Sequence, residues 1–140
     1  MSDFTESELE FLKSQRLGRL ATINPKGQPQ NSPVAFRYNP DFDTIDIGGR
    51  FMSQSKKFRN IANNNKVAFV VDDVQQNPWK VRGVEIRGTA VTVSEGGKEV
   101  FGPDYDADPS IIRITPTQII GWGFDSVPYQ QNNRKVAART

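Results

Sequence analysis

The stretch from Gly48 to Val71 concentrates the residues of this sequence that are best suited to holding an anion. Two hydroxyl residues, Ser53 and Ser55, stand before Lys56 and Lys57, and either serine can cap a short helix that begins here. Free backbone N–H groups and the positive end of the helix dipole lie at such a start. With two ammonium groups beside them, they predict a phosphate or phosphodiester site. The alternative is that both lysines lie on the solvated face of an amphipathic helix.

Composition narrows the chemistry that such a site can serve. The 140 residues include no histidine and no cysteine, which excludes Ser-His-Asp catalysis, disulfides and most transition-metal sites. No metal site is expected, and the loop with Asp104, Asp106 and Asp108 is interpreted as solvated because it lacks the glycine and distal glutamate of an EF-hand. An enzyme of this composition depends on carboxylates and tyrosines or on a bound cofactor.

The charge and hydrophobicity of the sequence indicate which partners and which cellular location to expect. The formal net charge is +2, and part of the basic excess lies in the final segment NNRKVAART, so no nucleic-acid partner is expected. Basic residues beside aromatic ones between Arg50 and Arg59 keep a small nucleic-acid-binding barrel as a less favoured alternative. No apolar run approaches the roughly 20 residues that cross a bilayer, and the N-terminus is acidic. We therefore expect a cytoplasmic protein with no membrane partner.

The pattern of apolar residues and turns predicts a mainly β domain. A helix is expected from about Glu6 to Gln15, with a capping box between Thr5 and Glu8. Short connections favour antiparallel pairing, and six or seven strands with two short helices indicate a small closed barrel. A glycine within the fifth strand can mark a bulge. The expected strands are Arg19–Ile23, Asn31–Tyr38, Thr44–Gly49, Lys66–Asp73, Val81–Ser94, Ile111–Thr115 and Gln118–Asp125.

The C-terminal residues are more polar than the rest of the chain and are assigned separately from the barrel. Residues 1–128 are predicted to form one barrel domain, because 140 residues fit one ordinary core. Residues 129–140 are predicted to be a polar, flexible tail. Since such a tail buries little surface, its removal is expected to leave thermal stability nearly unchanged.

The order of these pieces resembles a known superfamily. The segments RLATINPKGQPQNSPVAFRY, SQSKKFRNIANNNKVAFVVDD, VRGVEIRGTAVTV and RITPTQIIGWGFDS follow one another as in the split-barrel flavin and deazaflavin proteins, the pyridoxamine 5'-phosphate oxidase-like superfamily. The resemblance covers residues 4–126 and is greatest to the probable F420-dependent subgroup. It implies an FMN-binding split barrel that forms a homodimer, with the cofactor in a groove at the subunit interface.

The resemblance also implies which residues bind the cofactor. Ser55, Lys56 and Lys57 match the pattern that grips the phosphate-bearing chain, with Ser53 and Arg50 beside them. An F420 molecule carries a phosphodiester and an acidic tail, and it therefore needs more basic residues than the phosphate monoester of FMN.

Three further elements are carried over from the same resemblance. Ser32, Pro33 and Val34 match the strand whose backbone lies along the flavin or deazaflavin ring, although an ordinary sheet strand explains them equally well. Arg82 lies near residues that cross the dimer interface in relatives; the alternative is a salt bridge to Glu85 or to the Asp72–Asp73 pair. Trp122 matches a tryptophan of the last strand, and its alternative is a core position.

The function implied is an oxidoreductase that transfers a hydride between F420, or alternatively FMN, and an unidentified small organic acceptor. No side chain is assigned a catalytic role. A non-catalytic flavin- or deazaflavin-binding or carrier protein of the same fold remains an alternative.

Overall fold

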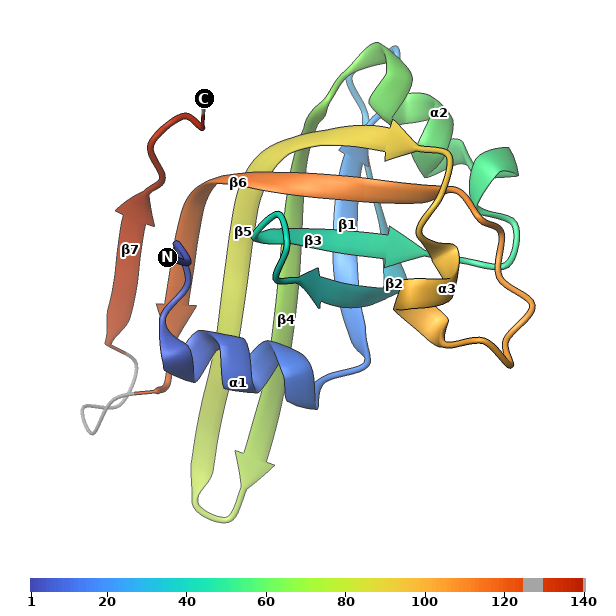
Figure 1. The fold of residues 1–140 in the computed structure, drawn as a ribbon. Helices are drawn as coiled ribbons and strands as arrows, with labels where there is room; N and C mark the ends of the chain where they lie inside the picture. The colour runs from blue at the N-terminus through green and yellow to red at the C-terminus, as the bar shows by residue number, and fades with distance from the viewer. Residues whose placement is uncertain (125–129, 140) are drawn as a thin grey trace.

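Seven antiparallel strands and three short helices make up residues 1–124 and 130–139, the part of the chain that the computed structural model describes (Figure 1). The helices are α1 (Glu6–Ser14), α2 (Lys56–Asn63) and α3 (Gly97–Phe101), and a 3-10 turn, η1 (Met52–Gln54), precedes α2. The strands are β1 (Leu17–Ile23), β2 (Pro29–Asn39), β3 (Thr44–Gly48), β4 (Lys66–Gln76), β5 (Trp79–Val93), β6 (Ile111–Trp122) and β7 (Gln131–Lys135).

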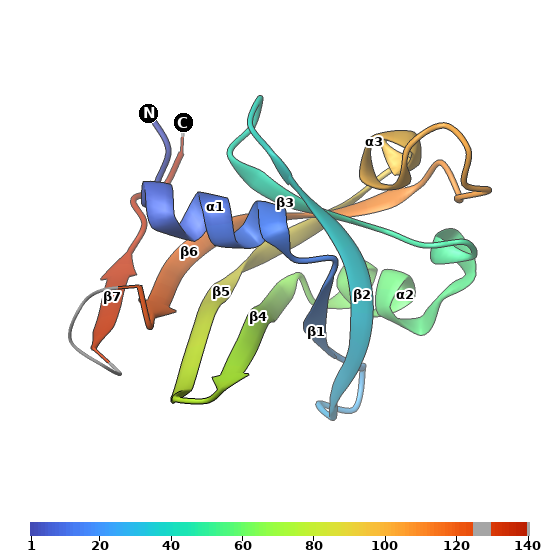
Figure 2. The ribbon, with the colours of Figure 1, turned by 90° about the horizontal axis from the view of Figure 1, so that it is seen from below.

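The strands form one sheet that closes on itself. Their order is β3-β2-β1-β4-β5-β6-β7, and an additional pairing of β3 with β6 joins the first six into a barrel. Strand β7 lies outside this ring as an edge strand beside β6. The helices α1 and α2 lie at opposite ends of the barrel, and the β4–β5 hairpin projects beyond it (Figures 1 and 2). The predicted mainly β split barrel is thereby confirmed. None of the described helices has the length and apolar character that a membrane crossing requires.

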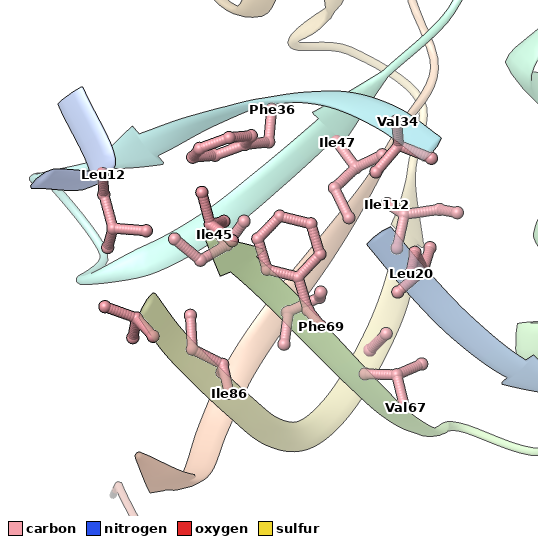
Figure 3. Close-up of a cluster of buried hydrophobic side chains, with 14 of the residues drawn as sticks. Leu12, Leu20, Val34, Phe36, Ile45, Ile47, Val67, Phe69, Ile86 and Ile112 are labelled. Carbon is pink, nitrogen blue, oxygen red and sulfur yellow. The ribbon is translucent and has the colours of Figure 1, made fainter. Parts of the chain in front are cut away.

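Alternating apolar residues from the barrel strands fill its interior (Figure 3). Phe69 of β4 meets Phe36 of β2 edge to face, with ring centroids 5.2 Å apart. Residue 18 must be a glycine because a Cβ atom there would overlap the Phe69 ring. Ile45 and Ile47 of β3 are completely buried, so the core extends across the line where the sheet closes.

The polar cap of α1 was correctly predicted. The Glu8 N–H donates to Thr5 Oγ1 at 3.1 Å, and the Thr5 N–H donates to Glu8 Oε1 at 2.9 Å, which completes the capping box. The helix ends at Ser14, one residue before the predicted end. Glu8 is only 1% exposed, so its carboxylate needs further partners inside the protein.

Strand β6 is one continuous strand where two were predicted. Pro116 lies between the two predicted strands and has no N–H to donate. In the structure it lies opposite Gly88, where the β5–β6 register shifts and a bulge interrupts the ladder. The hydroxyl of Thr117 donates to the Arg87 carbonyl at 3.1 Å and bridges the gap. The predicted glycine bulge is confirmed, and it is what allows proline inside this strand.

Strand β7 lies where a flexible tail was predicted. It pairs with β6 over residues 131–135, and Arg134 reaches the buried carboxylate of Glu8 with Nη2–Oε1 and Nη1–Oε2 distances of 2.5 and 3.1 Å. Further along, Arg139 contacts Asp3 at 2.9 Å and Asp43 at 3.4 Å. Polar composition conceals these long-range ion pairs. The predicted domain boundary near Tyr129 lies outside the described residues.

Replacing Arg134 with leucine should destabilise the protein strongly. The change leaves the Glu8 carboxylate buried without its cationic partner, which typically costs about 3–5 kcal/mol of unfolding free energy. Urea denaturation measures this difference. Lys135→Leu is the matched control, because Lys135 is exposed on the same strand and should change stability by only about 0.5 kcal/mol.

Ending the chain at Gln130 should also lower the melting temperature, because it removes β7 together with Arg134 and Arg139. This reverses the expectation from sequence alone. If the truncated protein has the same melting temperature as the unmodified protein, the C-terminal ion pairs contribute nothing to stability.

Candidate functional site

The start of α2 is built as the sequence predicts, with Ser55 as its cap. The Phe58 N–H donates to Ser55 Oγ at 3.3 Å, and that hydroxyl donates to the Met52 carbonyl at 2.6 Å. Lys56 is exposed and Lys57 is half-buried, and neither forms an ion pair with any described residue. Their ammonium groups and the first N–H groups of the helix can therefore receive an anion.

Ser53 is engaged by a protein carboxylate. Its N–H and its hydroxyl both donate to Asp108 Oδ2, at 2.9 and 2.5 Å. The hydrogen bond from the Ser53 hydroxyl, with those from the Ser110 and Ser53 N–H groups, lowers the pKa of Asp108 below its usual value. Asp108 is therefore ionised at neutral pH. Its loop also approaches Arg50, whose guanidinium lies 5.4 Å from the ring centre of Tyr105.

The buried face of α2 includes an amide that sequence patterns did not indicate. Ile61 and Asn60 are buried, whereas the apolar Ala62 is exposed. Asn60 Nδ2 donates to Thr22 Oγ1 at 3.0 Å and to Gln30 Oε1 at 2.7 Å. These bonds fix α2 against β1 and β2. In the polar sequence of this helix nothing distinguishes Asn60 from its exposed asparagine neighbours.

A shallow groove of about 580 Å³ crosses the outer face of the sheet next to this helix. Small side chains, Ala21 and Ala68, lie in it, and Lys66 and Arg87 supply positive charge. A second hollow of about 230 Å³ shares these alanines and continues toward Arg19. The Arg87 guanidinium donates to Glu85 at 2.7 and 3.2 Å. The alanines give the groove a flat surface and the basic side chains lie beside it. This arrangement suits a planar ring that carries anionic groups.

The residues predicted to contact the ring lie on β2, where one side of the strand pairs with no other strand in the described part of the chain. Strand β1 pairs with residues 29–35 of β2, but β3 pairs with β2 only from Ala35 onward. Pro33, which cannot donate a ladder hydrogen bond, thus lies on a one-sided edge, as its residue type indicated. Ser32 is half-buried, and Val34 points into the core at 5% exposure. The side chain of Val34 is therefore unable to contact a ligand at this edge, but its backbone can do so.

Arg82 and Trp122 lie toward the other end of the barrel. Arg82 donates to both oxygens of Asp73, at 3.1 and 2.6 Å, and these bonds raise its pKa. This is the salt bridge that the sequence left as the alternative. Trp122 packs over Gly83. The segment after α2 meets β5 at Ala90, eight residues from Arg82, or about 26 Å along a strand. One protomer does not bring these residues to Lys56.

Comparisons with known proteins agree with this architecture. The chain matches the family described as pyridoxamine 5'-phosphate oxidase over residues 4–123. It is 46% identical over 123 residues to the 5a,11a-dehydrotetracycline/5a,11a-dehydrooxytetracycline reductase of Streptomyces rimosus, covering 87% of this chain and 84% of that protein.

Two solved structures share the fold. One is a conserved hypothetical protein, Rv2991, from Mycobacterium tuberculosis, with a TM-score of 0.70, 22% identity and 91% of each chain covered. The other is an F420 reductase with a TM-score of 0.63 and 24% identity, covering 83% of this chain and 98% of that one. The identity to the Streptomyces enzyme supports oxidoreductase activity. The chain belongs to the pyridoxamine 5'-phosphate oxidase family.

Proposed function

We propose that this protein is an oxidoreductase that binds coenzyme F420, or alternatively FMN, and transfers a hydride between that cofactor and a small organic acceptor. Two observations support the proposal: a Ser55-capped helix start that carries Lys56 and Lys57, and the 46% identity to a reductase. The F420 reductase with the same fold favours F420 over FMN.

The residues at the start of α2 fit the phosphate of either cofactor. Ser55 caps the helix while the Lys56 and Lys57 N–H groups, as first and second helical residues, have no intrahelical acceptor. Two ammonium groups stand at the same place. Arg50 is exposed nearby and adds the charge that a phosphodiester and acidic tail require. The set is richer in cations than a phosphate monoester needs, which again favours F420.

The ring would lie against the unpaired edge of β2. When bound, the cofactor supplies the hydride chemistry. Backbone groups between Pro29 and Val34 that face away from β1 form no ladder with another described strand, and in this proposal they bind the polar edge of the ring. These contacts orient the ring and exclude water from one side of it. We assign no side chain a proton-transfer role.

The acceptor belongs, in this proposal, to the class of small organic compounds with a reducible double bond. The Streptomyces rimosus relative is named as a reductase of dehydrotetracyclines, and its identity to this chain extends over most of both proteins. A non-catalytic carrier is the competing possibility. Tight cofactor binding without turnover of any such acceptor would favour the carrier.

We further propose that two copies pair through the outer sheet face. Large apolar side chains are exposed there at Leu17, Val74 and Trp79, with relative exposures of 54, 47 and 62%. Strand alternation places them on the same face as Ala68. A twofold axis through the middle of this face would bring the hairpin end of one copy to the α2 end of the other. That arrangement would unite the two groups of predicted cofactor residues.

A fluorescence titration with F420, run beside one with FMN at fixed ionic strength, tests the proposed cofactor. Saturation by F420 at micromolar concentration with no response to FMN is the expected result. If neither cofactor binds, the proposed function is wrong.

Replacing Lys56 and Lys57 together with alanine should weaken F420 binding by about 2–4 kcal/mol, because two charge-assisted contacts are lost. The double variant Lys13→Ala/Lys135→Ala is the control, since it makes the same change in net charge at exposed positions on α1 and β7. Unchanged affinity in a folded Lys56/Lys57 variant would contradict the phosphate assignment.

Replacing Ala68 with arginine should produce monomers, because it puts a long charged side chain at the centre of the proposed interface. Sedimentation equilibrium should give twice the 15.7 kDa chain mass for the unmodified protein and the single mass for the variant. Ala137→Arg, an exposed position after β7, should remain dimeric. A monomeric unmodified protein would contradict the homodimer.

A further inference from the structure

The loop that leads into α2 is held by a carboxylate from a distant part of the chain. Asp108 Oδ2 accepts both the N–H and the hydroxyl of Ser53, at 2.9 and 2.5 Å, and Asp108 Oδ1 accepts the Ser110 N–H at 3.0 Å. In addition, the Asp108 N–H donates to the Gly49 carbonyl at 3.0 Å. One residue thus binds both ends of the segment from Gly49 to Ser53.

The backbone around Asp108 is itself fixed. Gly97, at the start of α3, lies so close to the Asp108 carbonyl that a Cβ atom at residue 97 would overlap it. The Gly97 N–H also donates to the Pro109 carbonyl at 3.1 Å. Because its backbone cannot shift without disturbing α3, Asp108 is not a group that an incoming anion would simply displace. Its carboxylate serves as a permanent anchor.

We infer that Asp108 is a positioning residue for the cofactor's phosphate: by anchoring Ser53 it sets the loop that presents Ser55, Lys56 and Lys57. This inference rests on the proposed function, since it assumes that the start of α2 binds the phosphate. It also changes the role of Ser53, which was predicted to bind the cofactor directly. Both donors of Ser53 are already used by Asp108, so Ser53 serves as the attachment point of the loop.

Two effects of the Asp108 carboxylate oppose each other. Its negative charge repels a phosphate, whereas its hydrogen bonds hold the donors of the loop in place. Repulsion between charges in contact with water is weakened by the high dielectric of water and further by salt. Loss of the anchor, in contrast, makes the cofactor bear the entropy of ordering the loop. We therefore expect the anchoring effect to dominate at physiological ionic strength.

Measurement of F420 dissociation constants by fluorescence separates these effects. Asp108→Ala should weaken binding about threefold to tenfold, the usual value of one hydrogen bond. Asp108→Asn keeps one carbonyl acceptor and should lie between this variant and the unmodified protein. Asp104→Ala is the control, because Asp104 is exposed in the same loop and makes no hydrogen bond or ion pair with a described residue. It should bind F420 within twofold of the unmodified protein.

A double-mutant cycle with Ser53→Ala tests whether Asp108 acts through Ser53. Because both single changes break the same contact, the double variant should bind F420 about as well as the weaker single variant. The KM for F420 should rise with kcat unchanged, since neither residue touches the reacting atoms. Additive effects, or an Asp108→Ala variant that binds as tightly as the unmodified protein, would overturn the inference.

Hydrogen exchange keeps this result separate from the proposed function. In the absence of cofactor, the Ser53 amide should exchange faster in Asp108→Ala than in Asp104→Ala, because its acceptor is gone. Equal exchange would overturn the anchor whether or not F420 binds. Faster exchange in a protein that binds neither F420 nor FMN would instead overturn the proposed function, and with it the role of Asp108 toward a phosphate.

Discussion

Closure of the barrel by a very short strand is the constraint on which the candidate site depends. Strand β3 meets β6 through only three residue pairs, and at the centre of them Asp46 lies opposite Arg113. The two side chains form a bidentate pair at 3.0 and 3.1 Å, and Asn39 and Thr44 donate to the same carboxylate. Asp46 is 2% exposed. Such a pair tolerates burial only when every oxygen is satisfied.

The shortness of β3 also creates the open edge of β2. Because β3 has five residues and β2 has eleven, the first half of β2 pairs with no described strand on the side away from β1. The chain leaves β3 at Gly48 and turns through η1 into α2, so the position of the helix start proposed to bind phosphate follows directly from the same short strand. A longer β3 would cover the backbone edge and displace the basic residues. The fold thus places the open edge of β2 and the start of α2, the two elements proposed to bind the cofactor, close together in sequence.

Local signals in the sequence predicted local structure well. The capping box at Thr5 and Glu8, the Ser55 cap and the bulge at Gly88 each depend on residues within a few positions of one another. The features that were missed depend on distant partners. Strand β7 is stabilised by Arg134 and Glu8, which are separated by 126 positions, and Asn60 is buried because Thr22 and Gln30 accept its hydrogen bonds. The residues on either side of Arg134 are polar, and an asparagine in a helix does not by itself indicate burial.

The predicted cofactor residues lie at two separate places in the barrel. The resemblance to the family selected residues from both ends of the barrel, and a single chain keeps Arg82 and Trp122 far from Lys56. Arg82 is already satisfied by Asp73 and lies 5.0 Å from the ring centre of Phe11. These contacts hold the Arg82 side chain in place within one protomer. If these residues share a ligand with the start of α2, the second copy must supply one of the two groups, and oligomeric state becomes part of the active-site question.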